Sequence, residues 1–302
     1  MSSLPIPEPH PFAEVIRLAR DDESERPPNP TAHGAFHWVP HHDDGLRDRM
    51  NAVARWVADT QPDAVVTDVS VEMATFVRLL GVPVIVMALP GNRFDAPHVL
   101  AHRLADHIIA AWPHELLAPS WLRGHAAKTS YVGGISRFDG RSCPPRVGAT
   151  DTRVLVLAGG SEDFGVTIDD CAQACPGTRW TVVGGTAGWK DDPWPQICAA
   201  DVVVTHAGQG AVADVAAARR RAVVIAAPRP FDEQAATAEV LRRHRLATVA
   251  RGVPEARAWP GLIAHALAGD PGKWVRWKVS GAAERAAAAI ESTVRHCAKA
   301  VV

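Results

Sequence analysis

Residues 201–237 of this 302-residue chain read DVVVTHAGQGAVADVAAARRRAVVIAAPRPFDEQAAT, and this stretch decides the fold. Its first apolar run, residues 202–204, is β-branched throughout, which is typical of a strand buried on both faces of a parallel sheet. Gly208 and Gly210 then allow a tight turn and close backbone approach, and a helix with Val212 on its apolar side begins there. A second apolar strand follows the helix. The stretch therefore predicts one βαβ unit of an α/β domain.

The start of the predicted helix suits an anionic ligand. A helix N-terminus offers unpaired N–H groups and the positive end of the helix dipole, so a diphosphate placed there would be stabilised without a metal ion. Glycine spacing alone fits an ordinary βαβ unit equally well. The order of the neighbouring residue types favours the ligand site.

That order resembles the nucleotide-sugar glycosyltransferases of the two-domain GT-B architecture, in particular the MurG-like group and the UDP-glycosyltransferases. Their signature runs His, x, Gly, an acid eight residues after the His, a Pro-rich loop and an acid–Gln pair. The matching residues here are His206, Gly208, Asp214, Glu233 and Gln234. The resemblance implies an α/β fold with two doubly wound Rossmann-like domains that face a cleft.

The resemblance also implies a role for each matching residue. Residues at the turn would contact the donor diphosphate: His206, Gly208, Gln209 and Gly210. Asp214 would hold the ribose hydroxyls, and Glu233 with Gln234 would bind the hydroxyls of the donor sugar. Many relatives carry Glu at the position of Asp214, so the identity of the sugar stays open.

A second glycine turn supports the first. Residues 153–165, RVLVLAGGSEDFG, predict an apolar strand that ends in Gly159, Gly160 and Ser161. The family places a similar turn beside the donor phosphates, whereas a strand followed by two glycines is by itself commonly a simple turn. Residues 182–185 end another predicted strand, where such domains usually meet the base through main-chain groups.

The chain divides into four parts. We predict an acceptor-side domain over residues 1–140, irregular and Pro-rich over 1–41, then a linker over 141–151 and a donor-nucleotide domain over 152–275. Residues 276–302 predict a long Ala-rich helix, which in GT-B proteins packs back on the first domain; a solvent-facing helix is the alternative. Within the first domain the pattern predicts further elements: helices over 45–59, 71–80 and from 98, and strands over 64–67 and 82–87.

Asp68 follows the predicted strand 64–67, at the end of a parallel strand where ligand-contacting residues lie in open α/β sheets. In the family an Asp in this context orients a basic His, which removes the acceptor proton. That His belongs to a Gly-rich loop after the first strand, and this chain opens instead with MSSLPIPEPH. We therefore expect the first βαβ unit and the basic His to be missing from these 302 residues, either because the sequence starts late or because the protein has lost them. With a late start, the full-length protein would carry the His. In both cases we expect sugar transfer by this chain to be poor.

Composition excludes some partners. The chain is 47% hydrophobic and 22% charged with a net charge of −1, and it lacks the basic stripe of a nucleic-acid-binding protein. No apolar run approaches the roughly 20 residues that span a bilayer, so we predict a cytoplasmic protein. Trp112 and Trp121 fit either a packed surface or a peripheral contact with the inner face of the membrane. Five scattered cysteines without CxxC spacing are expected to be free thiols.

No cofactor and no metal is expected. The chain shows no DxD pair suited to a divalent ion, and the helix at Gly208 would stabilise the leaving diphosphate instead. His41 and His42 stand beside Asp43 and Asp44 as in a metal cluster. They directly precede a predicted helix, however, where an Asp is a good cap.

Together these residues predict a glycosyltransferase. It would move a hexosyl or N-acetylhexosaminyl group from a nucleotide-sugar, with UDP as the expected nucleotide, to a small-molecule or lipid acceptor by metal-independent inverting displacement. A catalytically silent nucleotide-sugar-binding protein is one alternative. The other is a UDP-sugar epimerase of the same fold, for which Glu233 and Asp68 would supply the facing carboxylates.

Overall fold

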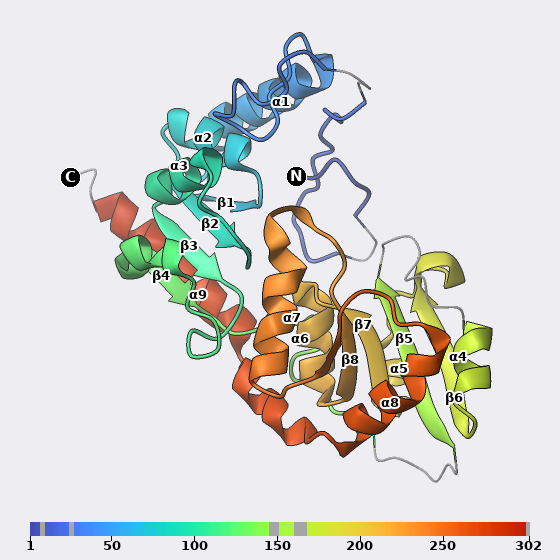
Figure 1. The fold of residues 1–302 in the computed structure, drawn as a ribbon. Coiled ribbons are helices and arrows are strands. Elements are labelled where there is room, and N and C mark those ends of the chain that lie inside the picture. The colour runs from blue at the N-terminus through green and yellow to red at the C-terminus, as the bar shows by residue number, and fades with distance from the viewer. Residues whose placement is uncertain (7–9, 24–26, 145–150, 160–167, 300–302) are drawn as a thin grey trace.

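Two parallel β-sheets, each in its own domain, form the framework of the chain (Figure 1). The computed structural model describes residues 1–6, 10–23, 27–144, 151–159 and 168–299. The first sheet has the strand order β1-β2-β3-β4 and the second the order β6-β5-β7-β8-β9. All neighbouring strands are parallel, as the unbroken apolar runs predicted.

Before the linker, the described residues of the first domain form α1 (Asp44–Thr60), β1 (Val65–Asp68), α2 (Val71–Leu79), β2 (Val84–Ala88), α3 (Ala96–Leu104), β3 (His107–Ala110) and β4 (Thr129–Tyr131), with the 3₁₀ segment η1 (Ser120–Lys128) between the last two. The helices begin where polar side chains cap them. Asp43 accepts a hydrogen bond from the Leu46 amide at 2.7 Å, and Ser70 accepts one from the Met73 amide at 3.1 Å. The sequence favoured an Asp cap at this point, and Asp43 is the N-cap of α1 in the structure.

The second domain alternates strands and helices around β5: β5 (Thr152–Gly159), α4 (Ile168–Ala174), β6 (Thr178–Gly184), α5 (Trp194–Ala199), β7 (Val202–His206), α6 (Gln209–Ala218), β8 (Arg221–Ile225), α7 (Glu233–Arg243), β9 (Thr248–Ala250) and α8 (Trp259–Ala268). The valines of β7 are completely buried, which is why a β-branched apolar run forms the strand beside β5. The predicted strand–helix–strand order of residues 201–237 is confirmed.

The final helix, α9 (Ala282–Lys299), lies against the first sheet (Figure 1). Ala286 and Ile290 of this helix pack with Ile85 of β2 and Ile109 of β3. The chain returns to the first domain beside the linker, where the Gly134 amide donates to the Trp277 carbonyl at 3.0 Å. No helix in the described part of the chain is long and apolar enough to cross a membrane.

Trp112 and Trp121 belong to the interior of the first domain. Their exposed fractions are 1% and 8%, and their indole nitrogens donate to the carbonyls of Leu117 and Gly91. Packing against the first sheet, and not a lipid surface, therefore explains these two aromatic residues.

Candidate functional site

The strand order of the second sheet places a ligand crevice at β5. The chain runs from β5 outward to β6 and then crosses to β7 on the other side of β5, so the order reverses between β5 and β7. In open α/β sheets ligands bind outside the carboxyl ends of the strands at such a point. Gly159 ends β5 and His206 ends β7, and a methyl group on Gly159 would lie 3.0 Å from His206 Nε2. Gly160 and Ser161, predicted beside the phosphates, lie outside the described residues.

The turn after β7 is built around His206. The Gly208 amide donates to His206 Nδ1 at 3.0 Å, and a Cβ on Gly208 would approach the ring to 2.6 Å, so only glycine fits. Burial lowers the pKa of His206, and Arg229 lowers it further. The ring is therefore neutral, accepts at Nδ1 and carries its proton on Nε2, which faces the end of β5.

Within the described part of the chain, hydrogen-bond donors at the start of α6 lack partners. Gly208 is the N-cap and provides no side-chain acceptor for the first amides of the helix, which include those of Gln209 and Gly210. The side-chain amide nitrogen of Gln209 is buried and has no partner among the described residues. Buried donors normally have partners, so this turn has the chemistry of an anion site.

Gln234 and Glu233, the predicted acid–Gln pair, make contacts in different parts of the structure. Gln234 Oε1 accepts from the amides of Ala207 and Ala227 at 3.2 and 3.0 Å, which ties the turn after β7 to the loop after β8. Its Nε2 atom has no partner in the part of the chain that the structure describes. Glu233 instead faces the first domain, where its Oε2 atom lies 3.7 Å from Arg93 Nη2.

Asp214 lies on α6 beneath the segment that joins the domains. Ser136 Oγ donates to Asp214 Oδ1 at 2.7 Å, and Arg137 Nε lies 3.9 Å from Oδ2. Burial raises the pKa of this carboxyl above its usual range. The Arg137 guanidinium also lies 5.7 Å from the ring centre of Trp189, which is 58% exposed. An acid, a cation and an exposed aromatic ring thus lie next to one another at this point.

Asp68 ends β1, as the sequence predicted, and lines a cavity of about 410 Å³ in the first domain. Its carboxylate has no hydrogen bond or ion pair with any described residue, and burial raises its pKa. The cavity is also lined by His37 and Trp38 of the N-terminal segment (residues 1–43) and by Glu72 of α2. No histidine among the described residues pairs with Asp68, in contrast to the pattern of the family that the sequence resembles.

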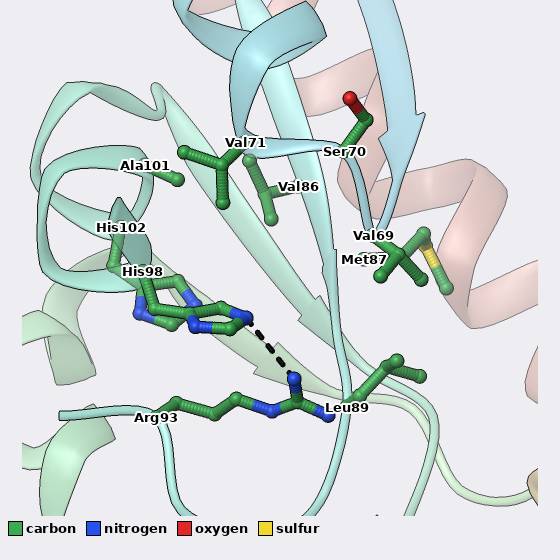
Figure 2. Close-up of a pocket in the computed structure, with 10 residues that line it drawn as sticks. All are labelled: Val69, Ser70, Val71, Val86, Met87, Leu89, Arg93, His98, Ala101 and His102. Carbon is green, nitrogen blue, oxygen red and sulfur yellow. Dashed lines mark hydrogen bonds between the residues drawn. The ribbon is translucent and has the colours of Figure 1, made fainter. Parts of the chain in front are cut away.

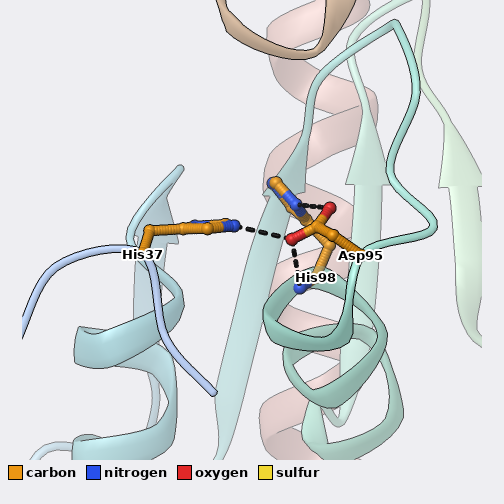
Figure 3. A group of neighbouring side chains, drawn as sticks. All are labelled: His37, Asp95 and His98. Carbon is orange, nitrogen blue, oxygen red and sulfur yellow. Dashed lines mark hydrogen bonds and ion pairs between the residues drawn. The ribbon is translucent and has the colours of Figure 1, made fainter. Parts of the chain in front are cut away.

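A different carboxylate, that of Asp95, binds two histidines of this domain. Asp95, the N-cap of α3, accepts from His37 Nε2 at 2.7 Å and from His98 Nδ1 at 2.6 Å (Figure 3). Arg93 Nη1 lies 3.0 Å from His98 Nε2, as Figure 2 shows beside His102. Burial lowers the pKa of His98 and lowers that of His102 to about 4. Burial alone would raise the pKa of Asp95, but the two imidazole donors outweigh it and lower that pKa.

Potential ligand atoms of His37, Asp95 and His98 all lie within 4.8 Å of one another, which is close enough for a metal ion. Two observations favour a hydrogen-bonded cluster. Both imidazoles already direct an N–H at the carboxylate. The buried guanidinium of Arg93 also touches the cluster, and its positive charge opposes a cation there.

This cluster faces the second domain. The Phe231 ring lies 5.1 Å from that of His37 and 4.7 Å from that of His98, and the Arg93 guanidinium lies 4.8 Å from it. Phe231 stands two residues before Glu233, and its carbonyl accepts from the Asn92 amide at 2.7 Å. The cluster therefore borders the interface between the two domains.

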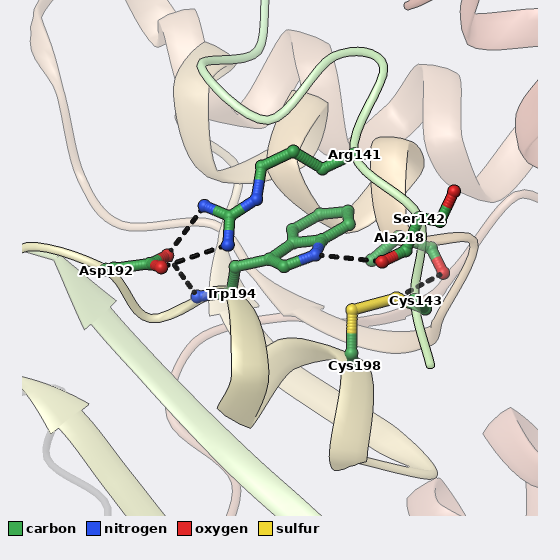
Figure 4. Close-up of a disulfide and its surroundings, with 7 residues drawn as sticks. All are labelled: Arg141, Ser142, Cys143, Asp192, Trp194, Cys198 and Ala218. Atoms are coloured by element: carbon green, nitrogen blue, oxygen red, sulfur yellow. Dashed lines mark hydrogen bonds and ion pairs between the residues drawn. A yellow bond between two sulfur atoms is a disulfide. The ribbon is translucent and has the colours of Figure 1, made fainter. Parts of the chain in front are cut away.

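The linker is fastened to α5 (Figure 4). Cys143 and Cys198 form a disulfide, so the prediction of free thiols is wrong for these two residues. Arg141 makes a double hydrogen bond to Asp192 at 2.9 and 3.0 Å. The two cysteines are 55 residues apart in the sequence, so only the fold brings them close enough to pair. Their spacing in the sequence therefore did not indicate the disulfide.

Residues 181–255 match the glycosyltransferase family 28 C-terminal domain. Three solved structures are similar to this chain. The glycotransferase of kitacinnamycin is 16% identical with a TM-score of 0.58, and the match covers 84% of this chain and 79% of that one; MurG of Acinetobacter baumannii is 17% identical with a TM-score of 0.56, and the match covers 82% of this chain and 78% of that one. Arabidopsis thaliana UGT89C1 complexed with UDP is 13% identical with a TM-score of 0.59, and the match covers 84% of this chain and 78% of that one. The chain has the GT-B fold. This GT-B protein resembles MurG and the UDP-glycosyltransferases, as predicted. No curated protein matches it by sequence.

Proposed function

We propose that this GT-B protein transfers a sugar from a UDP-sugar to a hydroxyl acceptor by metal-independent inverting displacement. The observation that carries the proposal is the start of α6, at the reversal of strand order. There the first helix amides have no side-chain cap, and Nε2 of Gln209 has no partner among the residues that the structure describes. The family 28 match covers this turn and supports its use for a nucleotide-sugar.

The diphosphate would lie at the N-terminus of α6. As the acceptor oxygen forms its bond to the anomeric carbon, the bond from that carbon to the diphosphate oxygen breaks on the opposite face, and the configuration inverts. Negative charge grows on the leaving diphosphate, where the helix amides and His206 Nε2–H stabilise it. The acceptor proton passes to a base on the side of the first domain.

We propose the remaining donor contacts from the positions of the neighbouring side chains. Asp214 would accept from the ribose hydroxyls, with Arg137 and Trp189 alongside. The free Nε2 of Gln234 and the carboxylate of Glu233 would bind the hydroxyls of a hexosyl or N-acetylhexosaminyl group. UDP as the nucleotide is supported by the similar plant structure that contains it.

Thermal unfolding with UDP, dTDP, GDP and ADP tests the donor site. A nucleotide present at about 100 times its Kd adds about 2.7 kcal/mol to the free energy of unfolding. We expect the largest rise in Tm with UDP and its loss in Asp214→Ala. Glu239→Ala is the matched control, because Glu239 is an exposed carboxylate of the same domain. A rise with none of the four, or one unchanged in Asp214→Ala, would contradict the proposed site.

Product analysis then separates the function classes. UDP-glucose and UDP-N-acetylglucosamine are incubated with and without a phenolic acceptor. A glycosylated phenol supports transfer. An isomerised donor formed without acceptor would indicate an epimerase, and nucleotide binding without any product a silent binding protein.

A further inference from the structure

His37 lies where an acceptor would meet the donor domain. Its ring lines the same cavity as Asp68 and lies 5.1 Å from the Phe231 ring of the second domain. Glu72 Oε1 accepts from the amides of His37 and Trp38 at 2.8 and 3.0 Å, so α2 fixes the backbone of the N-terminal segment at this point. The position of the imidazole is therefore defined by two packed elements.

The hydrogen bonds define which nitrogen of His37 is free. Because the pKa of Asp95 is lowered, its carboxylate is ionised near neutral pH and can only accept. His37 Nε2, 2.7 Å from Asp95 Oδ2, must then carry the proton, and the lone pair lies on Nδ1. Nδ1 has no partner among the described residues. His98 differs, since Asp95 and Arg93 engage both of its nitrogens.

We propose that His37 takes the proton of the acceptor hydroxyl at Nδ1, while Asp95 orients the ring and stabilises the imidazolium that forms. This inference rests on the proposed function and assigns its base. The acceptor oxygen gives its O–H proton to Nδ1 as it attacks the anomeric carbon, and the electron pair of the broken bond leaves with the diphosphate. Asp68 is then not needed to orient the base, and we assign it to the selection of the acceptor by charge.

The charges of the cavity indicate the class of acceptor. Asp21 is paired with Arg49 at 2.7 Å, and Glu72 is engaged by backbone amides. Asp68 has no partner in the described ranges of the chain, while Trp38 and Met50 contribute apolar surface. An aromatic or aliphatic hydroxyl compound that is neutral or cationic fits this lining. A carboxylate or phosphate on the acceptor would face an unpaired like charge.

Acceptor acidity tests the base. At pH 8.5, with UDP-glucose and UDP-N-acetylglucosamine as donors, transfer to 4-ethylphenol requires removal of a proton, whereas 4-nitrophenol is already ionised. General base catalysis contributes roughly 10²–10⁴-fold. We expect His37→Gln to lower kcat about 100-fold or more for 4-ethylphenol and less than about tenfold for 4-nitrophenol. Imidazole in solution should restore part of the activity of His37→Ala on 4-ethylphenol.

Controls separate this base from a structural residue. His41→Gln changes an exposed imidazole of the same segment and should leave both rates unchanged. Asp95→Asn keeps a capping oxygen on α3 and should lower kcat for 4-ethylphenol more than for 4-nitrophenol. Each variant must retain the UDP-induced rise in Tm. Equal loss with both phenols, or no loss, would overturn the assignment of His37. A wild-type chain that binds UDP and transfers to neither phenol would instead overturn the proposed function.

A charge series of phenols tests the role of Asp68. Tyramine, 4-ethylphenol and 3-(4-hydroxyphenyl)propionate carry similar hydroxyls but a positive, zero and negative charge. We expect kcat/KM to fall in that order, mainly through KM, and Asp68→Asn to reduce the difference between the first and the last. A preference for the anionic phenol, or an order that Asp68→Asn leaves unchanged, would overturn the proposed acceptor class.

Discussion

Gly208 and Gly210 stand two positions apart, but a methyl group would meet different surroundings at each. On Gly208 it would lie 2.6 Å from the His206 ring, and on Gly210 it would meet nothing within 4 Å. We expect Gly210→Ala to keep or raise Tm, since alanine in a helix is favoured by about 0.5–1 kcal/mol over glycine. It should nevertheless weaken UDP binding, because the methyl group occupies space above the helix amides.

Calorimetric titration with UDP and thermal unfolding measure both effects. Gly208→Ala should lower Tm and UDP affinity together, because His206 must move. If Gly210→Ala binds UDP as tightly as the wild type, the diphosphate does not lie at the start of α6.

Asp214 makes stability depend on pH. Its pKa is raised in the folded chain, so the native state disfavours the ionised form. This penalty appears as pH rises above the ordinary carboxyl pKa of about 4 and is complete above the raised value. Asp214→Asn keeps an acceptor for Ser136 and removes the penalty. We expect its Tm to exceed that of the wild type at pH 8 and to do so by less at pH 4; a difference independent of pH would contradict this account.

At this scale the sequence indicated the proposed donor residues, but it did not indicate the proposed base. His206, Gly208 and Asp214 follow one another within a single βαβ unit, so their spacing alone brings them together. His37 and Asp95 are 58 residues apart and meet only because the N-terminal segment packs against α2 and α3. The visible histidine pair at 41–42 is exposed and is not part of the cluster. Asp95 did carry a local signal, since an Asp two residues before Pro97 is typical of a helix start.

At the scale of the elements, a disulfide joins the linker covalently to α5. The Cys143–Cys198 disulfide closes a sequence separation of 55 residues. A loop of this size corresponds to about 4 kcal/mol in the chain-entropy estimate, and measured effects are typically about 2–4 kcal/mol. We expect Cys143→Ser to lower Tm under oxidising conditions and to abolish the effect of dithiothreitol on Tm. Cys297→Ser removes a cysteine with no disulfide partner and serves as the control. A wild-type Tm insensitive to dithiothreitol would contradict the predicted stabilisation.

Apolar patterning predicted the elements because burial decides them locally. The strands 64–67 and 82–87 and the helices 45–59 and 71–80 appear within a few residues of the expected bounds. Two contacts were not predictable in this way: the disulfide, and the hydrogen bonds by which Gln234 joins the turn after β7 to the loop after β8. Both depend on which segments the fold brings side by side, and a single sequence carries no direct signal for such pairs.

At the scale of the whole molecule, Gly91 controls how closely the domains approach. Its φ is +102°, and a Cβ there would lie 2.1 Å from the Phe231 carbonyl oxygen of the other domain. We expect Gly91→Ala to separate the two domains and increase the radius of gyration in small-angle scattering. UDP binding should persist, because the proposed donor contacts lie in the second domain, whereas transfer should fall at least about tenfold, because in the proposed mechanism the reacting groups meet between the two domains.

Gly81→Ala is the control for backbone strain. Gly81 also has a positive φ, +80°, but a Cβ there meets nothing within 4 Å. Both variants should lose about 1–2 kcal/mol through the left-handed backbone alone. If both change the radius of gyration equally, strain and not domain contact is responsible.

The position of α9 has a practical consequence for engineering. Because this last helix packs on the sheet formed by residues 65–131, the first domain is assembled from two separate stretches of the gene, and the second domain is inserted between them. A chimera with one crossover in the linker would place a foreign terminal helix on the native sheet. Exchange of donor specificity between relatives therefore requires two junctions, one near residue 144 and one near residue 278, so that the insert is replaced as a cassette.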